Sequence, residues 1–475
     1  MMHLAWLLFS TQLFATVNLD PQVVIDRLLA QGPEAQQIVY QSKRAELPYY
    51  EALSFFDTGM EIKTNYEIDQ SESVMGTSNV EDRSLGSSVK IRKRFKSGTH
   101  LSAQYGRLEQ NSILSTFTSS LRPDQQNQSA LYVELKQNLL NNAFGKKDRN
   151  QLKVAKLQMQ EAKLSRDEEL EQLILQTLAL YWDTYVTKQS LEEAIEARKL
   201  IGDLVNTVKK KSRMGYAAPG ELARVQAEFE MQDQRVKKLS SNYLTLLSTL
   251  KVKLKLDDDV ELEKVSKLPE VPNKSAVELE SQRFIKIARS RIETSKLMLS
   301  TAQNSALPVL DLDFSWSSIG VEQSADKAFT EMTSVTKPNY FVGLTLQFYL
   351  DSSSQGAAIA DKKIRLQDSE LSYNFLKSQL KSEVDNKYNF LSSSFKIVES
   401  TKKMLDHRLK ALKQMKTAYN QGRLDIDILI QAYRDQFSAQ VAHIQAIAQY
   451  YVNLHDYAAS KDELISDKQL ERQKL

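Results

Sequence analysis

The stretch PVLDLDFSWSSIG, Pro308 to Gly320, decides how the rest of the sequence is interpreted. Leu310, Leu312, Phe314 and Trp316 alternate with acidic or small polar residues. A period of two is typical of a strand with one apolar and one polar face. Most of the chain is instead rich in Lys, Glu, Gln, Leu and Ala and has the period of long helices. The sequence therefore predicts a mainly helical protein with strands whose apolar face needs an apolar cover.

The composition argues against several classes of function. The chain has 475 residues, and 63 Lys and Arg nearly balance 60 Asp and Glu, whereas a nucleic-acid-binding protein usually has a large basic excess. Cysteine is absent, which excludes disulfides, thiolate metal sites and a cysteine nucleophile. The five histidines lack metal-ligand spacing, and we find neither a nucleotide-binding glycine loop nor a Gly-x-Ser-x-Gly motif. We expect no enzyme, no cofactor and no nucleic-acid partner, and interpret Asp257-Asp258-Asp259 as an acidic linker rather than a metal site.

An apolar segment, LAWLLFSTQLFA, runs from Leu4 to Ala15. It has the length of a signal-peptide core and is too short to cross a bilayer as a helix. No Lys or Arg precedes it, and Leu13 is a poor residue at the small-residue position before cleavage. We predict a signal peptide over residues 1–15; the alternative is an apolar cap on the first helix.

The first half of the chain is predicted as a helix, a group of strands and a long helical hairpin. Asp20-Pro21 is an N-cap followed by proline, so a helix begins there and ends near Leu47-Pro48. Strands are expected within about 57–140, joined by polar loops at 70–85 and 109–128. Within them, 87–108 contains a hairpin that turns at Ser97-Gly98. A hairpin of two long helices, broken at GYAAPG (Gly215 to Gly220), is expected over about 142–256.

The same order returns in the second half. A helix is expected at about 276–306 and ends at Leu307-Pro308. Strands follow within about 308–351, around a polar loop at 320–339. A helical hairpin at about 355–459 then has its break at Gly422. Gly215 and Gly422 are as far apart in sequence as Leu222 and Leu429. We therefore expect two tandem repeats, 16–256 and 276–460, joined by an irregular linker at 257–275 and followed by a charged tail at 461–475.

Two arrangements would cover the apolar strand faces: a small soluble sandwich on a coiled coil, or a membrane barrel that is apolar outside and polar inside. Full charges on the opposite faces and aromatic residues at strand ends, such as Tyr66, Trp316 and Tyr340, favour the barrel. Lys93, on an otherwise apolar face, fits a barrel only at the membrane interface. Four to six strands cannot close a pore, so several chains must each contribute a sheet.

With these features, the chain resembles the TolC family of outer-membrane efflux proteins from about Asp20 to Ala459. The resemblance rests on the duplicated Leu-Pro entries, the strand-to-helix segments ending near Gly145 and Gly356, and the twin breaks RMGYAAPGEL and YNQGRLDIDIL. It implies a homotrimer in the outer membrane, whose β-barrel continues into a long periplasmic α-helical coiled-coil barrel. The hairpin at 87–108 is absent from the simplest members, so six strands per chain and eighteen per trimer are possible, unless the hairpin extends outside the membrane.

The resemblance also implies a function. The protein would be the passive exit duct of a tripartite efflux system for drugs or small toxic solutes, docking onto a periplasmic adaptor and an inner-membrane transporter. An exit duct for type I protein secretion is the alternative within the family. A soluble coiled-coil scaffold is the alternative of a different class.

Site residues follow from the family's closed inner end, which lies at the two helix-turn-helix tips, where the adaptor docks. The tips correspond to Arg213, Gly215, Tyr216, Gly422 and Arg423. The acidic gate ring of well-known members would fall at Ile428 and Gln431, but the acids here are Asp425 and Asp427, which we take as the candidate gate. The open alternatives are an ordinary helix N-cap for Asp425 and a solvated turn residue for Arg423.

Overall fold

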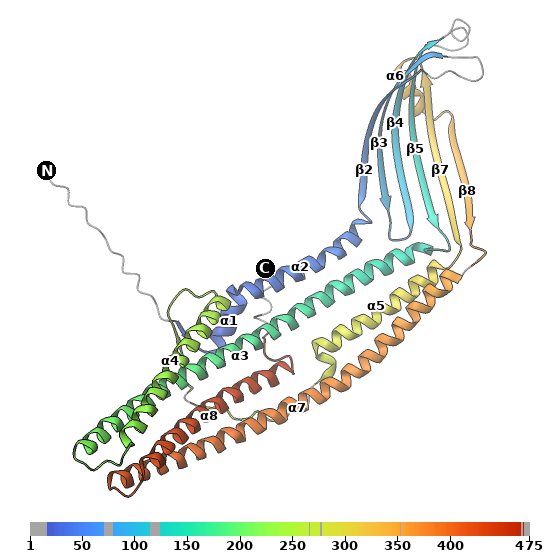
Figure 1. The fold of residues 1–475 in the computed structure, drawn as a ribbon. Helices are drawn as coiled ribbons and strands as arrows, with labels where there is room; N and C mark the ends of the chain where they lie inside the picture. The colour runs from blue at the N-terminus through green and yellow to red at the C-terminus, as the bar shows by residue number, and fades with distance from the viewer. Residues whose placement is uncertain are drawn as a thin grey trace, which may run out of the picture. The chain divides into compact units, whose positions relative to one another are not determined.

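The computed structural model describes residues 17–70, 79–114, 124–265, 267–275, 278–351, 353–466 and 469. The predicted signal peptide and most of the predicted tail lie outside these residues. The chain divides into two compact units. The hairpin unit comprises Met1–Arg44, Lys163–Lys286 and Asn374–Leu475, and the sheet unit comprises Ala45–Ala162 and Ile287–Tyr373. Each unit therefore takes segments from both halves of the chain (Figure 1).

The sheet unit is built on six antiparallel strands in the order β2-β3-β4-β5-β7-β8. Their bounds are β2 Thr58–Asp69, β3 Asn79–Arg94, β4 Thr99–Leu114, β5 Gln125–Asn138, β7 Val309–Glu322 and β8 Pro338–Gln347. The hairpin predicted at 87–108 forms the paired ends of β3 and β4, so one chain supplies six strands. The prediction of polar loops is wrong for residues 79–85, 109–114 and 125–128, which belong to strands. Their Ser, Asn and Gln side chains look loop-like, but their backbones continue the ladder.

The register of the ladder gives the sheet one continuous apolar face, because directly paired residues point to the same side. One row crosses all six strands through Met60, Ile91, Ala103, Val133, Trp316 and Tyr340. The row beside it passes through Thr58, Lys93, Leu101, Leu135, Phe314 and Val342. Ile62 and Val342 are each 68 % exposed, so large apolar side chains on this side of the sheet are not covered by other parts of the described chain. Lys93 lies one residue before the end of β3, at the end of the face rather than its middle.

The opposite face of the sheet carries a network of ion pairs. Glu61 on β2 pairs with Arg92 on β3 at 3.4 Å, and Lys90 on β3 lies 3.9 Å from Glu134 on β5. Lys136 continues the network to Asp311 at 2.8 Å. The two faces of one sheet thus differ in polarity along its full width.

Long helices make up most of the rest. Their bounds are α1 Pro21–Gln31, α2 Pro33–Ser54, α3 Lys146–Arg213, α4 Glu221–Leu254, α5 Arg283–Ser305, α7 Ser353–Asn420 and α8 Ile426–Ala459, with one-turn helices η2 Ala143–Gly145 and η3 Leu279–Ser281. The predicted end of the first helix at Leu47-Pro48 is wrong. Proline removes one backbone hydrogen bond and need not end a helix, and α2 carries Pro48 inside it and continues to Ser54. No helix among the described residues has the length and apolarity needed to cross a membrane.

The main core of the hairpin unit gathers segments that are far apart in sequence. Leu28 of α1, Ile174 and Trp182 of α3 and Leu250 of α4 are all buried in one cluster. The ring of Trp182 stacks on Tyr451 of α8 at 4.4 Å between centroids. The cluster includes Leu19 of β1 (Val17–Leu19), a strand that pairs in parallel with β6 (Val260–Leu262). The linker predicted as irregular therefore contains a strand that closes this core.

A short helix, α6 (Ala325–Ser334), lies between β7 and β8. The predicted polar loop at 320–339 is wrong, because most of these residues belong to the end of β7, to α6 and to the start of β8. Two buried side chains, Ala328 and Met332, are one helical turn apart and face the sheet. Such a short apolar stripe among polar residues gives too weak a period to be recognised in sequence alone.

Candidate functional site

The predicted tips are two copies of the same turn. Gly215 and Gly422 have positive φ angles of 78° and 71°. After α3, the Gly215 and Tyr216 amides donate to the carbonyls of Ser212 and Lys211 at 3.1 and 2.9 Å. After α7, the Gly422 and Arg423 amides donate to the carbonyls of Tyr419 and Ala418 at 3.0 and 2.9 Å. This pair of bonds is the Schellman motif, in which a left-handed residue satisfies the last carbonyls of a helix.

Replacing Gly422 with alanine is expected to lower the free energy of unfolding by about 1–2 kcal/mol, because an L side chain is strained at this left-handed position. Thermal and urea unfolding followed by circular dichroism would measure it. Gly356→Ala is the matched control. Gly356 is exposed within α7, and a Cβ added there would meet no atom within 4 Å. Alanine at this position should therefore stabilise the helix by up to about 1 kcal/mol. Equal effects at both glycines would contradict the role of the turn.

Polar contacts join the two tips. The Tyr419 hydroxyl donates to Glu221, in the first turn of α4, at 2.5 Å, and Glu221 also accepts the Ala218 amide at 2.9 Å. Lys211 of α3 lies over the Tyr419 ring and donates to its carbonyl at 3.3 Å. Burial, followed by the hydrogen bond to Glu221, raises the pKa of Tyr419 well above its usual range, so the phenol remains a donor. Sequence reasoning missed these residues, because contacts across hairpins leave no local pattern.

The two candidate gate acids are engaged differently. Asp425 is the N-cap of α8 and accepts the Asp427 amide at 2.8 Å, which confirms the capping interpretation. The Asp427 carboxylate forms an ion pair with Arg224 of α4, so it links the two hairpins. Both acids are exposed, as are Arg213, Gly215, Tyr216, Gly422 and Arg423. All seven predicted residues thus lie at the two tips of one unit.

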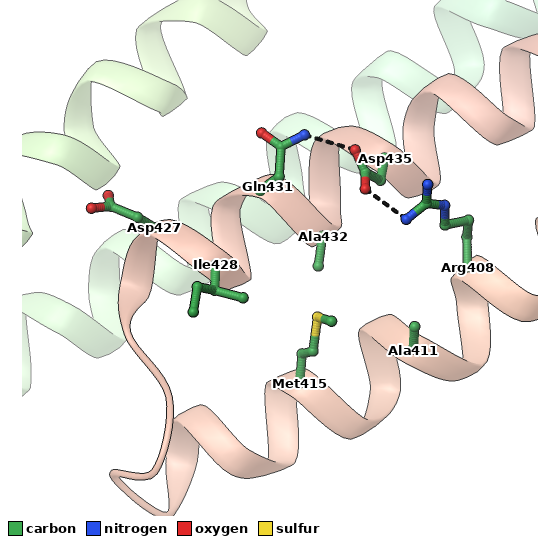
Figure 2. A pocket seen from close by; sticks show the side chains of 8 residues that line it. All are labelled: Arg408, Ala411, Met415, Asp427, Ile428, Gln431, Ala432 and Asp435. Atoms are coloured by element: carbon green, nitrogen blue, oxygen red, sulfur yellow. Dashed lines mark hydrogen bonds and ion pairs between the residues drawn. The ribbon is translucent and has the colours of Figure 1, made fainter.

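A groove between α7 and α8 begins beside Asp427 (Figure 2). Met415, Ala411, Ile428 and Ala432 form its apolar floor. Asp435 borders it and accepts from both Gln431 and Arg408 at 2.7 Å. Ile428 and Gln431, the positions aligned with the family's gate ring, lie on this groove. Because apolar and hydrogen-bonding groups alternate along it, the groove suits another helix better than a small polar solute.

A buried acid fixes the hairpins against each other further from the tips. Glu228 of α4 is 2 % exposed and accepts from Arg434 of α8 at 2.9 Å and from Gln232 at 2.7 Å. Near the tips, Ile201, Val208, Val225, Tyr419 and Leu429 belong to one apolar cluster with contributions from α3, α4, α7 and α8. The two tips are therefore supported by a packed core of four helices.

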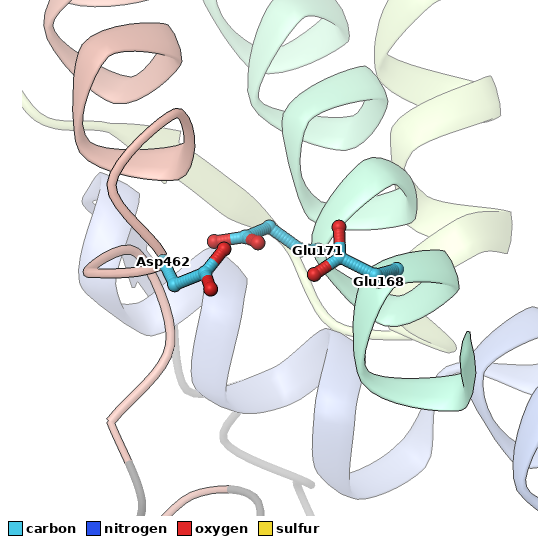
Figure 3. A group of neighbouring side chains, drawn as sticks. All are labelled: Glu168, Glu171 and Asp462. Atoms are coloured by element: carbon cyan, nitrogen blue, oxygen red, sulfur yellow. The ribbon is translucent and has the colours of Figure 1, made fainter. Parts of the chain in front are cut away.

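Three carboxylates meet elsewhere in the hairpin unit: Glu168 and Glu171 of α3, and Asp462 after α8 (Figure 3). Arg283, at the start of α5, forms ion pairs with all three. Asp462 also accepts the Arg283 backbone amide at 2.8 Å and holds a positive φ of 58° to do so. The guanidinium therefore supplies the cation for this group, which acts as a junction of three chain segments rather than as an open metal site.

The junction has unusual protonation chemistry. Burial raises the pKa of Glu171 to about 8, against the opposing effect of Arg283, while Glu168 and Asp462 raise it further. Burial also raises the pKa of Glu168, although Arg283 opposes this. One cation faces three carboxylates, of which Glu171 is buried, so the raised pKa of Glu171 favours a bound proton that reduces the excess negative charge.

Solved structures with the same fold are outer-membrane channels. The CmeC outer membrane channel of Campylobacter jejuni matches with a TM-score of 0.70 and 13 % identity, over 95 % of this chain and 89 % of that chain. The Neisseria gonorrhoeae MtrE outer membrane channel matches with a TM-score of 0.66 and 16 % identity, over 94 % of this chain and 89 % of that chain. The outer membrane protein VceC of Vibrio cholerae matches with a TM-score of 0.67 and 12 % identity, over 93 % of this chain and 95 % of that chain.

The likeness covers nearly the whole of each chain, so the resemblance to the TolC family predicted from the sequence is confirmed at the level of the fold. No protein-family model and no curated protein sequence matches the chain.

Proposed function

We propose that three copies of this chain form an outer-membrane exit duct. Their six-stranded sheets would close into one barrel of eighteen strands, and their helical hairpins would continue as a periplasmic tube. The duct would carry drugs or small toxic solutes out of the cell, together with a periplasmic adaptor and an inner-membrane transporter. The work of the duct is passive: diameter, lining charge and the state of its inner end set what passes.

The continuous apolar face of the sheet carries this proposal. Rows of apolar side chains that cross all six strands need a nonpolar surrounding, and the ion pairs of the opposite face need water. In the described part of the chain, β2 and β8 end the sheet with unpaired edges. Open edges are not viable in lipid, and pairing β8 of one copy with β2 of the next removes them. Fold likeness to outer-membrane channels supports the same assembly.

The two tips are proposed as the docking surface for the adaptor. Tyr216 is 80 % exposed at one tip, and Arg423 is exposed at the equivalent position of the other. An aromatic ring and a guanidinium are both effective anchors at protein interfaces. Arg213, Gly215 and Gly422 complete the two turns that present them.

Membrane fractionation followed by imaging of the detergent-extracted protein tests the duct. The expected result is a three-fold particle from the outer membrane, with a short barrel continued by a long tube. A protein recovered without detergent, as a thin rod with a small head, would overturn the proposal. The apolar strand faces would then pack on one another, as in a soluble scaffold.

Neutralising the candidate gate is expected to lower the preference of the open duct for cations. Asn is as good an N-cap as Asp, so Asp425→Asn should keep the start of α8, while Asp427→Asn removes the charge paired with Arg224. Reversal potentials of the double variant in planar bilayers would measure the change in selectivity. Asp361→Asn, which lies on α7 outside the tips, is the control. Unchanged conductance and selectivity in the double variant would exclude a gate at these acids.

A further inference from the structure

The register of β7 determines the side of the sheet on which α6 lies. Ser318 and Gly320 point to the same side as Trp316, because they follow it at intervals of two. Ser318 pairs with Leu131, and Leu131 with Tyr105, so all three belong to the apolar face. The Ser318 hydroxyl donates to the carbonyl of Met332 in α6 at 2.6 Å. The helix therefore covers part of the apolar face, not the ion-paired one.

Further contacts hold α6 on that face. A Cβ on Gly320 would lie 2.1 Å from the carbonyl oxygen of Ala328, so only glycine lets the helix approach this closely. The ring of Phe329 meets that of Tyr105 on β4 edge to face, with centroids 6.2 Å apart. Glu331 accepts the Val321 amide at 3.0 Å, where β7 has passed the end of β8. The helix is thus fixed to the sheet at three separate points.

The position of α6 along the sheet matches the edge of an apolar band. β7 begins just after α5, so α6 lies at the end of the sheet remote from that helix. From Leu310 to Ser318 a strand rises by about 27 Å, or about 20 Å along a membrane normal at the usual tilt of about 40°. The apolar band of outer-membrane barrels is about 25 Å high. Counted from Leu310, the hydrocarbon region would therefore end at the level of α6.

We propose that α6 is an interfacial helix, which lies in the headgroup layer of the outer leaflet on the lipid side of the sheet. This inference rests on the proposed function. The partner of the exposed helix face is the lipid surface, because this face continues directly from the apolar row at Trp316. Phe329 is 48 % exposed and faces the boundary of the acyl chains, while Asp326, Lys327 and Thr330 face outward into water. An aromatic ring beside charged groups is the usual pattern at this depth.

Nitroxide labels test the depth of the helix, and a chain without cysteine needs no background substitutions. Phe329→Cys and Thr330→Cys would be labelled in the full protein, reconstituted in vesicles of phosphatidylethanolamine and phosphatidylglycerol. Power saturation would compare collisions with oxygen, which concentrates in lipid, and with a water-soluble nickel chelate. Three reference labels are needed: Val133→Cys in the apolar face, Ser102→Cys in the polar face and Thr207→Cys, partly exposed on α3 of the hairpin unit.

The expected result is a depth for residue 329 between those of residues 133 and 207, with residue 330 shallower than 329. A label at 329 as accessible to the nickel chelate as the label at 207, while 133 is protected, would overturn the inference and leave the barrel standing. A label at 133 that behaves like the label at 102 would contradict the proposed function itself. Because Thr330 is exposed and its hydroxyl donates to the Asp326 carbonyl within α6, its label also detects a helix displaced by the loss of Phe329.

Discussion

Replacing Arg283 with methionine is expected to lower the free energy of unfolding by about 3–5 kcal/mol. The substitution leaves Glu168, Glu171 and Asp462 facing one another without a cation, and breaking one partner of a buried ion pair has a cost of this size. The substitution keeps the packing of the aliphatic part of the arginine side chain, since methionine is similar to that part in length. Urea unfolding of the detergent-solubilised protein, followed by circular dichroism, would measure the loss.

Two further variants show whether charge is the cause. Arg291 lies on α5, as Arg283 does, and Arg291→Met removes an ion pair with Glu161 of α3. The Arg291 side chain is 64 % exposed, so a change of at most about 1 kcal/mol is expected. Adding Glu168→Gln and Glu171→Gln to Arg283→Met should recover part of the lost stability, because the stranded anions become neutral. If the triple variant is no more stable than Arg283→Met, packing and not electrostatics holds the junction.

Glu171→Gln is expected to be more stable than the wild type at alkaline pH and nearly equal to it at acid pH. In the folded protein the pKa of Glu171 is raised from 4.5 to about 8, so the folded state holds a proton that the unfolded state releases. The contribution of this carboxyl to stability is therefore complete below pH 4.5 and is lost as the pH rises towards 8. The loss approaches about 1.4 kcal/mol per pH unit at most. Glutamine does not titrate and escapes it.

Unfolding midpoints in urea between pH 4.5 and 9 would give the difference between the two proteins. The difference should grow up to about pH 8 and then become constant. Glu169→Gln, exposed on the same helix, should run parallel to the wild type at every pH. A constant difference between Glu171→Gln and the wild type over the whole range would mean that Glu171 is ionised in the folded protein.

The sequence predicted those parts of the fold that are set by local pattern. The alternation around Phe314, the long proline-free segments and the two glycine turns each depend on residues a few positions apart, and each forms as expected. The positions of the two turns could be found because the glycine break occurs twice in the sequence, and both copies have the same hydrogen bonds. The roles assigned to the seven tip residues come from the family resemblance and stay a prediction. The capping role of Asp425 is also local, since its partner is two residues away.

The parts that could not be predicted depend on distant contacts. The Arg283 junction joins α3, α5 and the segment after α8, and each of its charges alone resembles an ordinary surface residue. The helix α6 is held by contacts with Ser318 and Tyr105 in addition to its own short apolar stripe, Ala328 and Met332. Strand ends rich in Ser, Asn and Gln are wrongly predicted as loops, because polarity indicates exposure to water but not the conformation of the backbone.

The pairing of β1 with β6 has a consequence for the order in which the chain folds. Val17 pairs with Val260, so a strand at the very beginning of the described chain has its partner beyond the first helical hairpin. A polypeptide emerging N-terminus first, from a ribosome or a translocon, must keep Val17–Leu19 unpaired until residue 262 follows. The first repeat then cannot complete its core as it emerges, and Leu19 remains an exposed apolar segment during that interval.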